Sequence, residues 1–161
     1  MLLGIGYDIH RLTDNRKLIM GGILFDTLYG LYGHSDADVV LHAVCDALLG
    51  AAAMGDIGEH FPDTDQRWKG VSSQIITASV VALVNEKGYS VNNIDVNIIA
   101  ERPKVSSRKY DIKENLAKLL NVDSGRVNIK AKTNEGLDAI GRGEAIVSQV
   151  IVSLNENNQN P

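Results

Sequence analysis

The sequence has a single cysteine, only 5% aromatic residues and no excess of basic side chains. Because Cys45 is alone, a disulfide within the chain is excluded, and the composition is compatible with a reducing cytoplasm. The 16 Lys and Arg residues are outnumbered by 20 Asp and Glu residues, which gives a net charge of -4. This balance argues against a general nucleic-acid-binding or anionic-membrane-binding surface.

Long apolar segments are missing as well. No run of about 18 uncharged apolar residues occurs, so no membrane-spanning helix is expected. The N-terminus lacks the basic start and small-residue cleavage pattern of a signal peptide. With 161 residues, 44% of them hydrophobic, the chain can bury a core of its own. We therefore expect one soluble, cytoplasmic domain over residues 1–161, without nucleic-acid or membrane partners.

Alternating strand and helix patterns run along the chain. Strand periodicity is found at residues 2–9, in a hairpin at 17–25, and at 94–103, 126–133 and 145–154. Helical periodicity is found at residues 35–55, with Ser35 as the expected N-cap, and at 72–88 and 106–121. This order predicts an α+β fold, an α/β sandwich with a mixed sheet. The polar residues 155–161 are expected to form a frayed tail.

Both alternating faces of the strand at 145–154 are largely apolar. One face carries Ile146, Val150 and Val152, and the other carries Val147 and Ile151. A single layer of helices would cover only one of these faces. The pattern leaves two explanations open: helices on both faces of the sheet, or a second face buried in an oligomer.

An acid and two imidazoles form a candidate metal site. Asp8 and His10 are two positions apart on the first strand, so their side chains point to the same face. His42 lies on the first helix. One oxygen and two nitrogens are a ligand set that suits zinc, and three protein ligands leave a fourth position open. Asp46 is either an acceptor for the second ring nitrogen of His42 or a solvated acid.

Several longer motifs resemble one enzyme family. They are G-Y-D-I-H at 6–10, G-H-S-D-A-D-V-x-L-H at 33–42, D-A-L-L-G-A-A-A-M-G-D-I-G at 46–58, F-P-D-T-D at 61–65, A-E-R-P-K at 100–104, V-N-I-K-A-K-T-N-E at 127–135 and G-R-G-E-A at 141–145. Together they resemble the 2-C-methyl-D-erythritol 2,4-cyclodiphosphate synthases of the non-mevalonate isoprenoid pathway. The resemblance implies a mixed sheet with helices on one face, and a homotrimer packed through the sheets with sites between subunits.

The resemblance also implies a reaction. Members of the family are lyases that convert 4-diphosphocytidyl-2-C-methyl-D-erythritol 2-phosphate to the 2,4-cyclodiphosphate and CMP. The reaction is an intramolecular attack of the 2-phosphate on the β-phosphate. The resemblance places Zn²⁺ on Asp8, His10 and His42, one ion per subunit, and Mg²⁺ or Mn²⁺ with the substrate diphosphate at Glu135. Catalytic roles fall on His34 and Thr133, which would stabilise the transition state.

Substrate binding is implied for further positions. Those near the zinc site and its flap are Asp8, Ile9, His10, His34, Ser35, His42, Asp56, Ile57, Gly58, Phe61, Pro62, Asp63, Thr64 and Asp65. Those of the cytidine pocket and its surroundings are Ala100, Glu101, Arg102, Pro103, Lys104, Val105, Ser106, Lys132, Thr133, Asn134, Glu135, Ala139 and Arg142.

The chain departs from the family pattern at two positions. Ala139 stands where the family has a phenylalanine that lines the trimer axis, and Lys132 where many members have threonine. Without the aromatic wall, we expect weak binding of isoprenoid diphosphates in the axial cavity, although Arg142 remains. The metal set alone also permits a zinc-dependent phosphoesterase or a non-catalytic trimeric binding module. The G-H-S-D and A-E-R-P-K segments favour the synthase, because a phosphoesterase needs no cytidine pocket and a structural zinc site needs no open coordination position.

Overall fold

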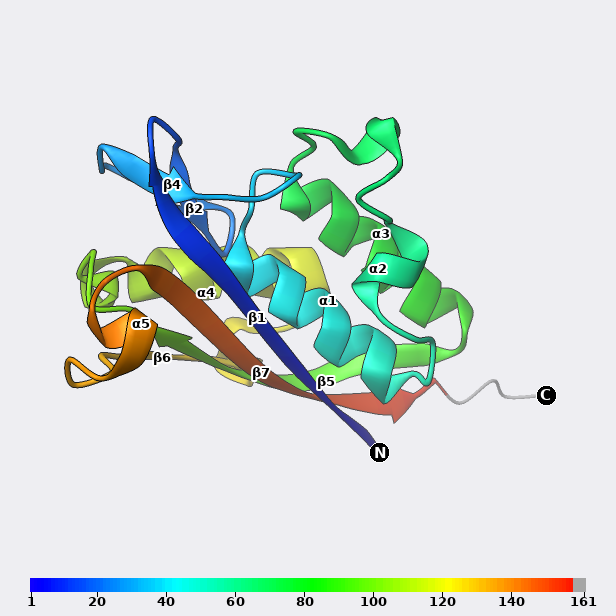
Figure 1. Ribbon diagram of the computed structural model, residues 1–161. Helices are drawn as coiled ribbons and strands as arrows, with labels where there is room; N and C mark the ends of the chain where they lie inside the picture. The colour runs from blue at the N-terminus through cyan, green and yellow to red at the C-terminus, as the bar shows by residue number, and fades with distance from the viewer. Residues whose placement is uncertain (158–161) are drawn as a thin grey trace.

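A five-stranded mixed sheet forms one layer of the protein, and three long helices form the other (Figure 1). The computed structural model describes residues 1–157, so residues 158–161 of the expected tail lie outside the described residues. The strands are β1 (Leu2–Asp14), β2 (Leu18–Met20), β3 (Ile23–Phe25), β4 (Tyr29–Leu31), β5 (Tyr89–Ile99), β6 (Val127–Lys132) and β7 (Ala145–Glu156). The helices are α1 (Val39–Ala51), α2 (Ile57–His60), α3 (Ser73–Glu86), α4 (Lys109–Leu120) and α5 (Asp138–Gly141), with 3-10 turns η1 (Gln66–Trp68), η2 (Val105–Arg108) and η3 (Ser124–Arg126).

The strand order in the large sheet is β4-β1-β7-β5-β6. β7 pairs antiparallel with both β1 and β5, and β5 pairs parallel with β6 through the crossover that contains α4. The prediction of an α+β fold with a mixed sheet is therefore confirmed. β7 extends to Glu156, two residues into the segment expected to be a tail.

The first helix lies directly on the first strand. A Cβ atom added at Gly6 would stand 1.8 Å from the Ala43 carbonyl oxygen, and one at Gly4 would stand 2.0 Å from the Ala47 carbonyl oxygen. Only glycine allows a helix backbone to come this close to a strand. The close contact brings the strand that carries Asp8 beside the helix that carries His42.

The start of α1 differs from the prediction. Asp38, rather than Ser35, is the N-cap, and its carboxylate accepts from the amides of Val40 and Leu41, both at 3.1 Å. It also accepts from the two amides of the Gly21-Gly22 turn, at 2.8 and 2.6 Å. Burial raises the pKa of Asp38 to about 6, although these hydrogen bonds oppose the shift. The buried carboxylate thereby joins the β2–β3 hairpin to the first helix.

Other element boundaries follow the sequence more closely. The second long helix has Ser72 as its N-cap and ends at Glu86, two residues before the end of the predicted range 72–88. The helix predicted at 106–121 begins as the 3-10 turn η2 and becomes α-helical only at Lys109. It ends at Asn121, which adopts the left-handed conformation that closes many helices. The polar segment after Gly55, to which the sequence patterns assign neither strand nor helix, contains α2 and η1.

The three long helices lie on one face of the sheet (Figure 1). The opposite face exposes large apolar side chains of β1 and β7, which are Leu3 (65%), Ile5 (74%), Tyr7 (52%), Ile9 (45%) and Ile151 (55%). Helices on both faces, one of the two explanations for the apolar last strand, are therefore wrong for residues 1–157. The exposed apolar strand face remains to be explained.

The glycine contacts on α1 generate a stability prediction. We expect Gly6→Ala to lower the free energy of unfolding by about 3 kcal/mol or more, because the new methyl group meets helix backbone that cannot rotate away. Gly50→Ala is the matched control on α1, since the nearest atom to its added Cβ is 3.9 Å away. That substitution should stabilise the helix by up to about 1 kcal/mol. Equal unfolding energies for the two variants in urea denaturation would contradict the account.

Candidate metal centre and phosphate pocket

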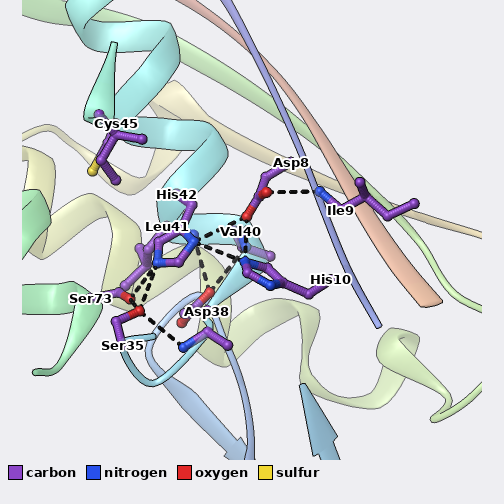
Figure 2. Close-up of polar contacts among 12 residues, drawn as sticks. Asp8, Ile9, His10, Ser35, Asp38, Val40, Leu41, His42, Cys45 and Ser73 are labelled. Carbon is purple, nitrogen blue, oxygen red and sulfur yellow. Dashed lines mark hydrogen bonds and ion pairs between the residues drawn. The ribbon is translucent and has the colours of Figure 1, made fainter. Parts of the chain in front are cut away.

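Three side chains meet between β1 and α1 (Figure 2). The Oδ2 atom of Asp8 lies 2.9 Å from Nε2 of His10 and 3.1 Å from Nδ1 of His42. The two ring nitrogens are 3.1 Å apart. Ile9, between the two strand residues, points away from the cluster (Figure 2). The i and i+2 positions of one strand and a helix residue thus supply the three atoms, as the sequence predicted.

The charges of the cluster favour an ionised carboxylate. Burial by itself raises the pKa of Asp8, but hydrogen bonds from His10 and His42 outweigh it and set the pKa at about 2. Burial also lowers the pKa of His10, whereas the Asp8 carboxylate and the Tyr32 carbonyl raise it above its ordinary value overall. The cluster is therefore a negative centre that attracts a proton or a metal cation.

The donor set fits a metal ion. Nδ1 of His10 lies 2.7 Å from the Tyr32 carbonyl oxygen, which can only accept, so Nδ1 carries a proton. In the neutral ring, Nε2 then presents a lone pair to the carboxylate of Asp8. Two acceptors at 2.9 Å repel each other unless a cation lies between them. One carboxylate oxygen and two imidazole nitrogens could hold zinc with a fourth position open.

The interpretation of Asp46 as the acceptor for the second ring nitrogen of His42 is wrong. Asp46, one helical turn further on, accepts a hydrogen bond at 2.8 Å from the Ile57 amide at the start of α2. Burial raises the pKa of this carboxyl. Nε2 of His42 instead lies 3.0 Å from the hydroxyls of Ser35 and Ser73.

A cavity of about 950 Å³ opens beside the metal ligands. Its wall includes His10 and His42 and also His34, whose Nε2 atom is buried without a hydrogen-bond partner among the described residues. A buried, unpaired nitrogen on a residue of the cavity wall is suited to a ligand oxygen. The predicted binding residues on this wall are His10, His34, Ser35, His42, Ile57, Gly58, Phe61, Pro62, Asp63 and Thr64.

Two predicted binding residues next to this cavity have structural contacts of their own. Asp56 is the N-cap of α2 and accepts from the Glu59 amide at 3.0 Å. Asp65 caps η1 and forms an ion pair with Arg67 at 2.6 Å. Phe61 packs edge-on against Trp68 with ring centroids 4.9 Å apart. This contact fixes the first residue of the expected flap at 61–65.

A second cavity, of about 420 Å³, lies elsewhere on the chain. Eight of its nine lining residues were predicted to bind substrate: Ala100, Glu101, Pro103, Lys104, Val105, Ser106, Lys132 and Thr133. The ninth is Ala131. Its edge is ordered by the Glu101 carboxylate, which accepts from the amides of Asn134 at 2.8 Å and Gly136 at 3.2 Å. No residue lines both cavities. One chain therefore carries the predicted site as two separate halves.

Nine predicted site residues line neither cavity: Asp8, Ile9, Asp56, Asp65, Arg102, Asn134, Glu135, Ala139 and Arg142. Glu135 is exposed and accepts from the Thr133 hydroxyl at 3.1 Å. The Arg102 guanidinium lies 4.9 Å from the centroid of the Tyr29 ring, and Arg142 forms an ion pair with Glu144 at 2.8 Å. Ala139 is a half-buried residue of α5.

Comparison with known proteins identifies the family. The model of the YgbB family matches residues 1–155. The 2-C-methyl-D-erythritol 2,4-cyclodiphosphate synthase of Clostridium acetobutylicum is 53% identical over 154 residues, which cover 96% of this chain and 99% of that protein. The chain belongs to the YgbB family.

Solved structures of similar proteins share the fold. The IspF of Plasmodium falciparum in complex with CDP superimposes with a TM-score of 0.86 at 32% identity, covering 98% of this chain and 97% of that chain. The bifunctional IspDF of Campylobacter jejuni gives a TM-score of 0.93 at 39% identity over 96% of this chain. This chain spans only 42% of the length of that bifunctional protein. This chain therefore shares its α+β architecture with both of these solved structures.

Two side chains of this YgbB-family site were not found from the sequence. Arg16 donates to the carbonyls of Gly33 at 2.7 Å and Ser35 at 2.8 Å, and so holds the loop that carries His34. Ser73, fully buried at the start of α3, reaches Nε2 of His42. Both come from segments remote in sequence, and no spacing rule connects them to the metal ligands.

The geometry predicts which histidines matter for metal binding. His42→Ala should abolish stoichiometric zinc binding while the protein stays folded, because the buried apolar side chains of α1 are unchanged. His60→Ala is the matched control, since His60 contacts the Met54 carbonyl and not the cluster. Metal analysis of purified, zinc-equilibrated protein measures the occupancy. Full zinc occupancy in the His42 variant, or loss in the His60 variant, would contradict the assignment.

Proposed function

We propose that this chain is a 2-C-methyl-D-erythritol 2,4-cyclodiphosphate synthase, a lyase of isoprenoid biosynthesis. It would convert 4-diphosphocytidyl-2-C-methyl-D-erythritol 2-phosphate to the 2,4-cyclodiphosphate and CMP. The observation that carries the proposal is the pairing of an Asp8/His10/His42 cluster beside one cavity with a second cavity at Ala100–Ser106. Family membership and a similar structure in complex with CDP support the same function.

The chemistry requires little activation by the protein. An oxygen of the 2-phosphate forms a bond to the β-phosphorus, and the bond from that phosphorus to the CMP oxygen breaks. Because a phosphate is already ionised near neutral pH, no activated serine or cysteine is needed. The only thiol, that of Cys45, is fully buried, and burial raises its pKa to about 12. The site has to fold the substrate and stabilise crowded anionic oxygens.

The residues around the larger cavity suit that task. His34 presents its unpaired Nε2, and Ser35 an adjacent hydroxyl, to a phosphate oxygen. Asp56, with Ile57 and Gly58, would accept hydrogen bonds from the methylerythritol hydroxyls. Zn²⁺ held by the three-residue cluster would withdraw charge from a phosphate oxygen. These groups orient the two reacting phosphates at one wall of the cavity.

The smaller cavity suits the cytidine end of the substrate. Backbone groups of residues 100–106 would read the base, and Lys104 and Lys132 would attract the phosphates. Thr133 would stabilise the transition state. Mg²⁺ or Mn²⁺ would be held at Glu135 together with diphosphate oxygens and water.

A homotrimer would join the two halves. The substrate must reach both cavities, yet one chain lines them with separate sets of residues. The uncovered sheet face carries Ile5 and Tyr7, which are 74% and 52% exposed, in a continuous apolar row along β1. Three copies packed through these faces would bury the row and place the sites between neighbouring subunits.

We also assign the protein to the cytoplasm, with a small cytidine diphosphate ester as its ligand. No helix among residues 1–157 is long and apolar enough to cross a membrane. The lone, buried Cys45 is consistent with a reducing compartment.

Incubation with the cytidylyl substrate tests the function. With Zn²⁺ and Mg²⁺ present, ³¹P NMR should show CMP and the cyclic diphosphate in equal amounts, and chelation of the metals should stop the reaction. Restoring both ions should restore it. Release of inorganic phosphate would identify a zinc-dependent phosphoesterase instead. No reaction by the metal-loaded protein would favour a non-catalytic binding module.

A further inference from the structure

The side of the His42 ring that faces away from Asp8 and His10 contacts α3, a helix that carries none of the three candidate metal ligands. Its Nε2 atom, on the side of the ring away from the cluster, lies 3.0 Å from the hydroxyl oxygen of Ser73 (Figure 2). Ser73 is the first residue of α3, and it is fully buried. A buried hydroxyl in contact with a metal-ligating histidine can determine which ring nitrogen carries the proton.

The proton of the Ser73 hydroxyl is committed elsewhere. The hydroxyl donates a short hydrogen bond to Oδ1 of Asp36. The other carboxylate oxygen of Asp36 accepts from the Ser73 backbone amide at 3.0 Å. The carboxylate thus accepts both donors of one residue, and the serine oxygen has only its lone pairs left for His42.

This arrangement suits the tautomer of His42 that binds a metal through Nδ1. When Nδ1 binds a metal beside Asp8 and His10, Nε2 carries the ring proton and can donate it to the Ser73 oxygen, which can only accept. The second hydroxyl near Nε2, that of Ser35, is compatible with this tautomer but does not impose it. It accepts from the Ala37 amide at 3.1 Å, and its own proton is free to rotate.

We propose that Asp36 and Ser73 are positioning residues, which together orient the His42 ring so that Nδ1 binds the metal while Nε2 donates its proton to the Ser73 oxygen. The proposal rests on the metal site of the proposed function, and it concerns the zinc-bound protein. Neither side chain touches the metal ligand atoms themselves. Their contribution is an acceptor in a fixed place for the Nε2 proton, which lowers the cost of orienting the ring for the metal.

Ser73→Ala tests the proposal, and Thr77→Val is the matched control. Thr77 is also fully buried, one turn further along α3, and its hydroxyl donates to the Ser73 carbonyl at 2.8 Å and lies near Cys45 rather than His42. Competition with a chelator measures zinc affinity without any substrate. We expect affinity to fall by about 10- to 100-fold in Ser73→Ala and to stay at the wild-type value in Thr77→Val.

The Nε2 proton of His42 provides a second readout. In NMR spectra of the zinc-loaded protein, we expect this proton to exchange slowly with solvent in the wild type and faster in Ser73→Ala. Asp36→Asn keeps the side-chain shape but leaves one oxygen for the two Ser73 donors. It should weaken zinc binding in the same direction, and it serves as the test if Ser73→Ala does not fold.

Three results would overturn the proposal: fast exchange of the His42 Nε2 proton in the zinc-loaded wild type, unchanged zinc affinity in a folded Ser73 or Asp36 variant, or an equal loss in Thr77→Val. All three are read without turnover. Failure of the wild-type protein to form the cyclic diphosphate would instead reject the proposed function and leave the zinc-affinity measurement intact.

Discussion

The close contact between β1 and α1 is the constraint on which the site depends. Gly4 and Gly6 let the carbonyls of Ala47 and Ala43 sit where a side chain would otherwise stand. The register of helix on strand is thereby fixed by backbone atoms, which cannot change rotamer as side chains do. Asp8 follows Gly6 by two residues, and His42 precedes Ala43. The three ligand atoms are brought within hydrogen-bonding distance by the same contact that packs the core.

Secondary contacts then hold each ligand in one orientation. The Tyr32 carbonyl fixes the ring of His10, and the hydroxyls of Ser35 and Ser73 face the far side of His42. The buried Asp38 ties the Gly21-Gly22 turn to the start of α1, and so anchors the helix end from which His42 projects. Rigid elements supply the ligands, whereas loops supply the cavity wall around His34. This division matches a site in which metal ligands are preorganised and substrate contacts can adjust.

The sequence predicted the parts of the site that depend on local periodicity or on long motifs. Asp8 and His10 follow from strand alternation, and the second cavity at 100–106 follows from the A-E-R-P-K segment. Ser35 was the expected cap of the first helix, but Asp38, buried beneath the hairpin, is the actual one. Asp46 lies one helical turn from His42, but its carboxylate accepts a hydrogen bond from the Ile57 amide instead. The contact between Asp36 and Ser73 joins segments 37 residues apart, which no local pattern encodes.

The central claim is that Asp8, His10 and His42 form the zinc site of this chain. X-ray absorption at the zinc edge of the zinc-loaded protein tests it most directly, because the spectrum distinguishes imidazole, oxygen and sulfur ligands. The account predicts two imidazole nitrogens at about 2.0–2.1 Å, oxygen in the remaining positions and no sulfur. A sulfur shell at about 2.3 Å, or three or more imidazoles, would contradict it.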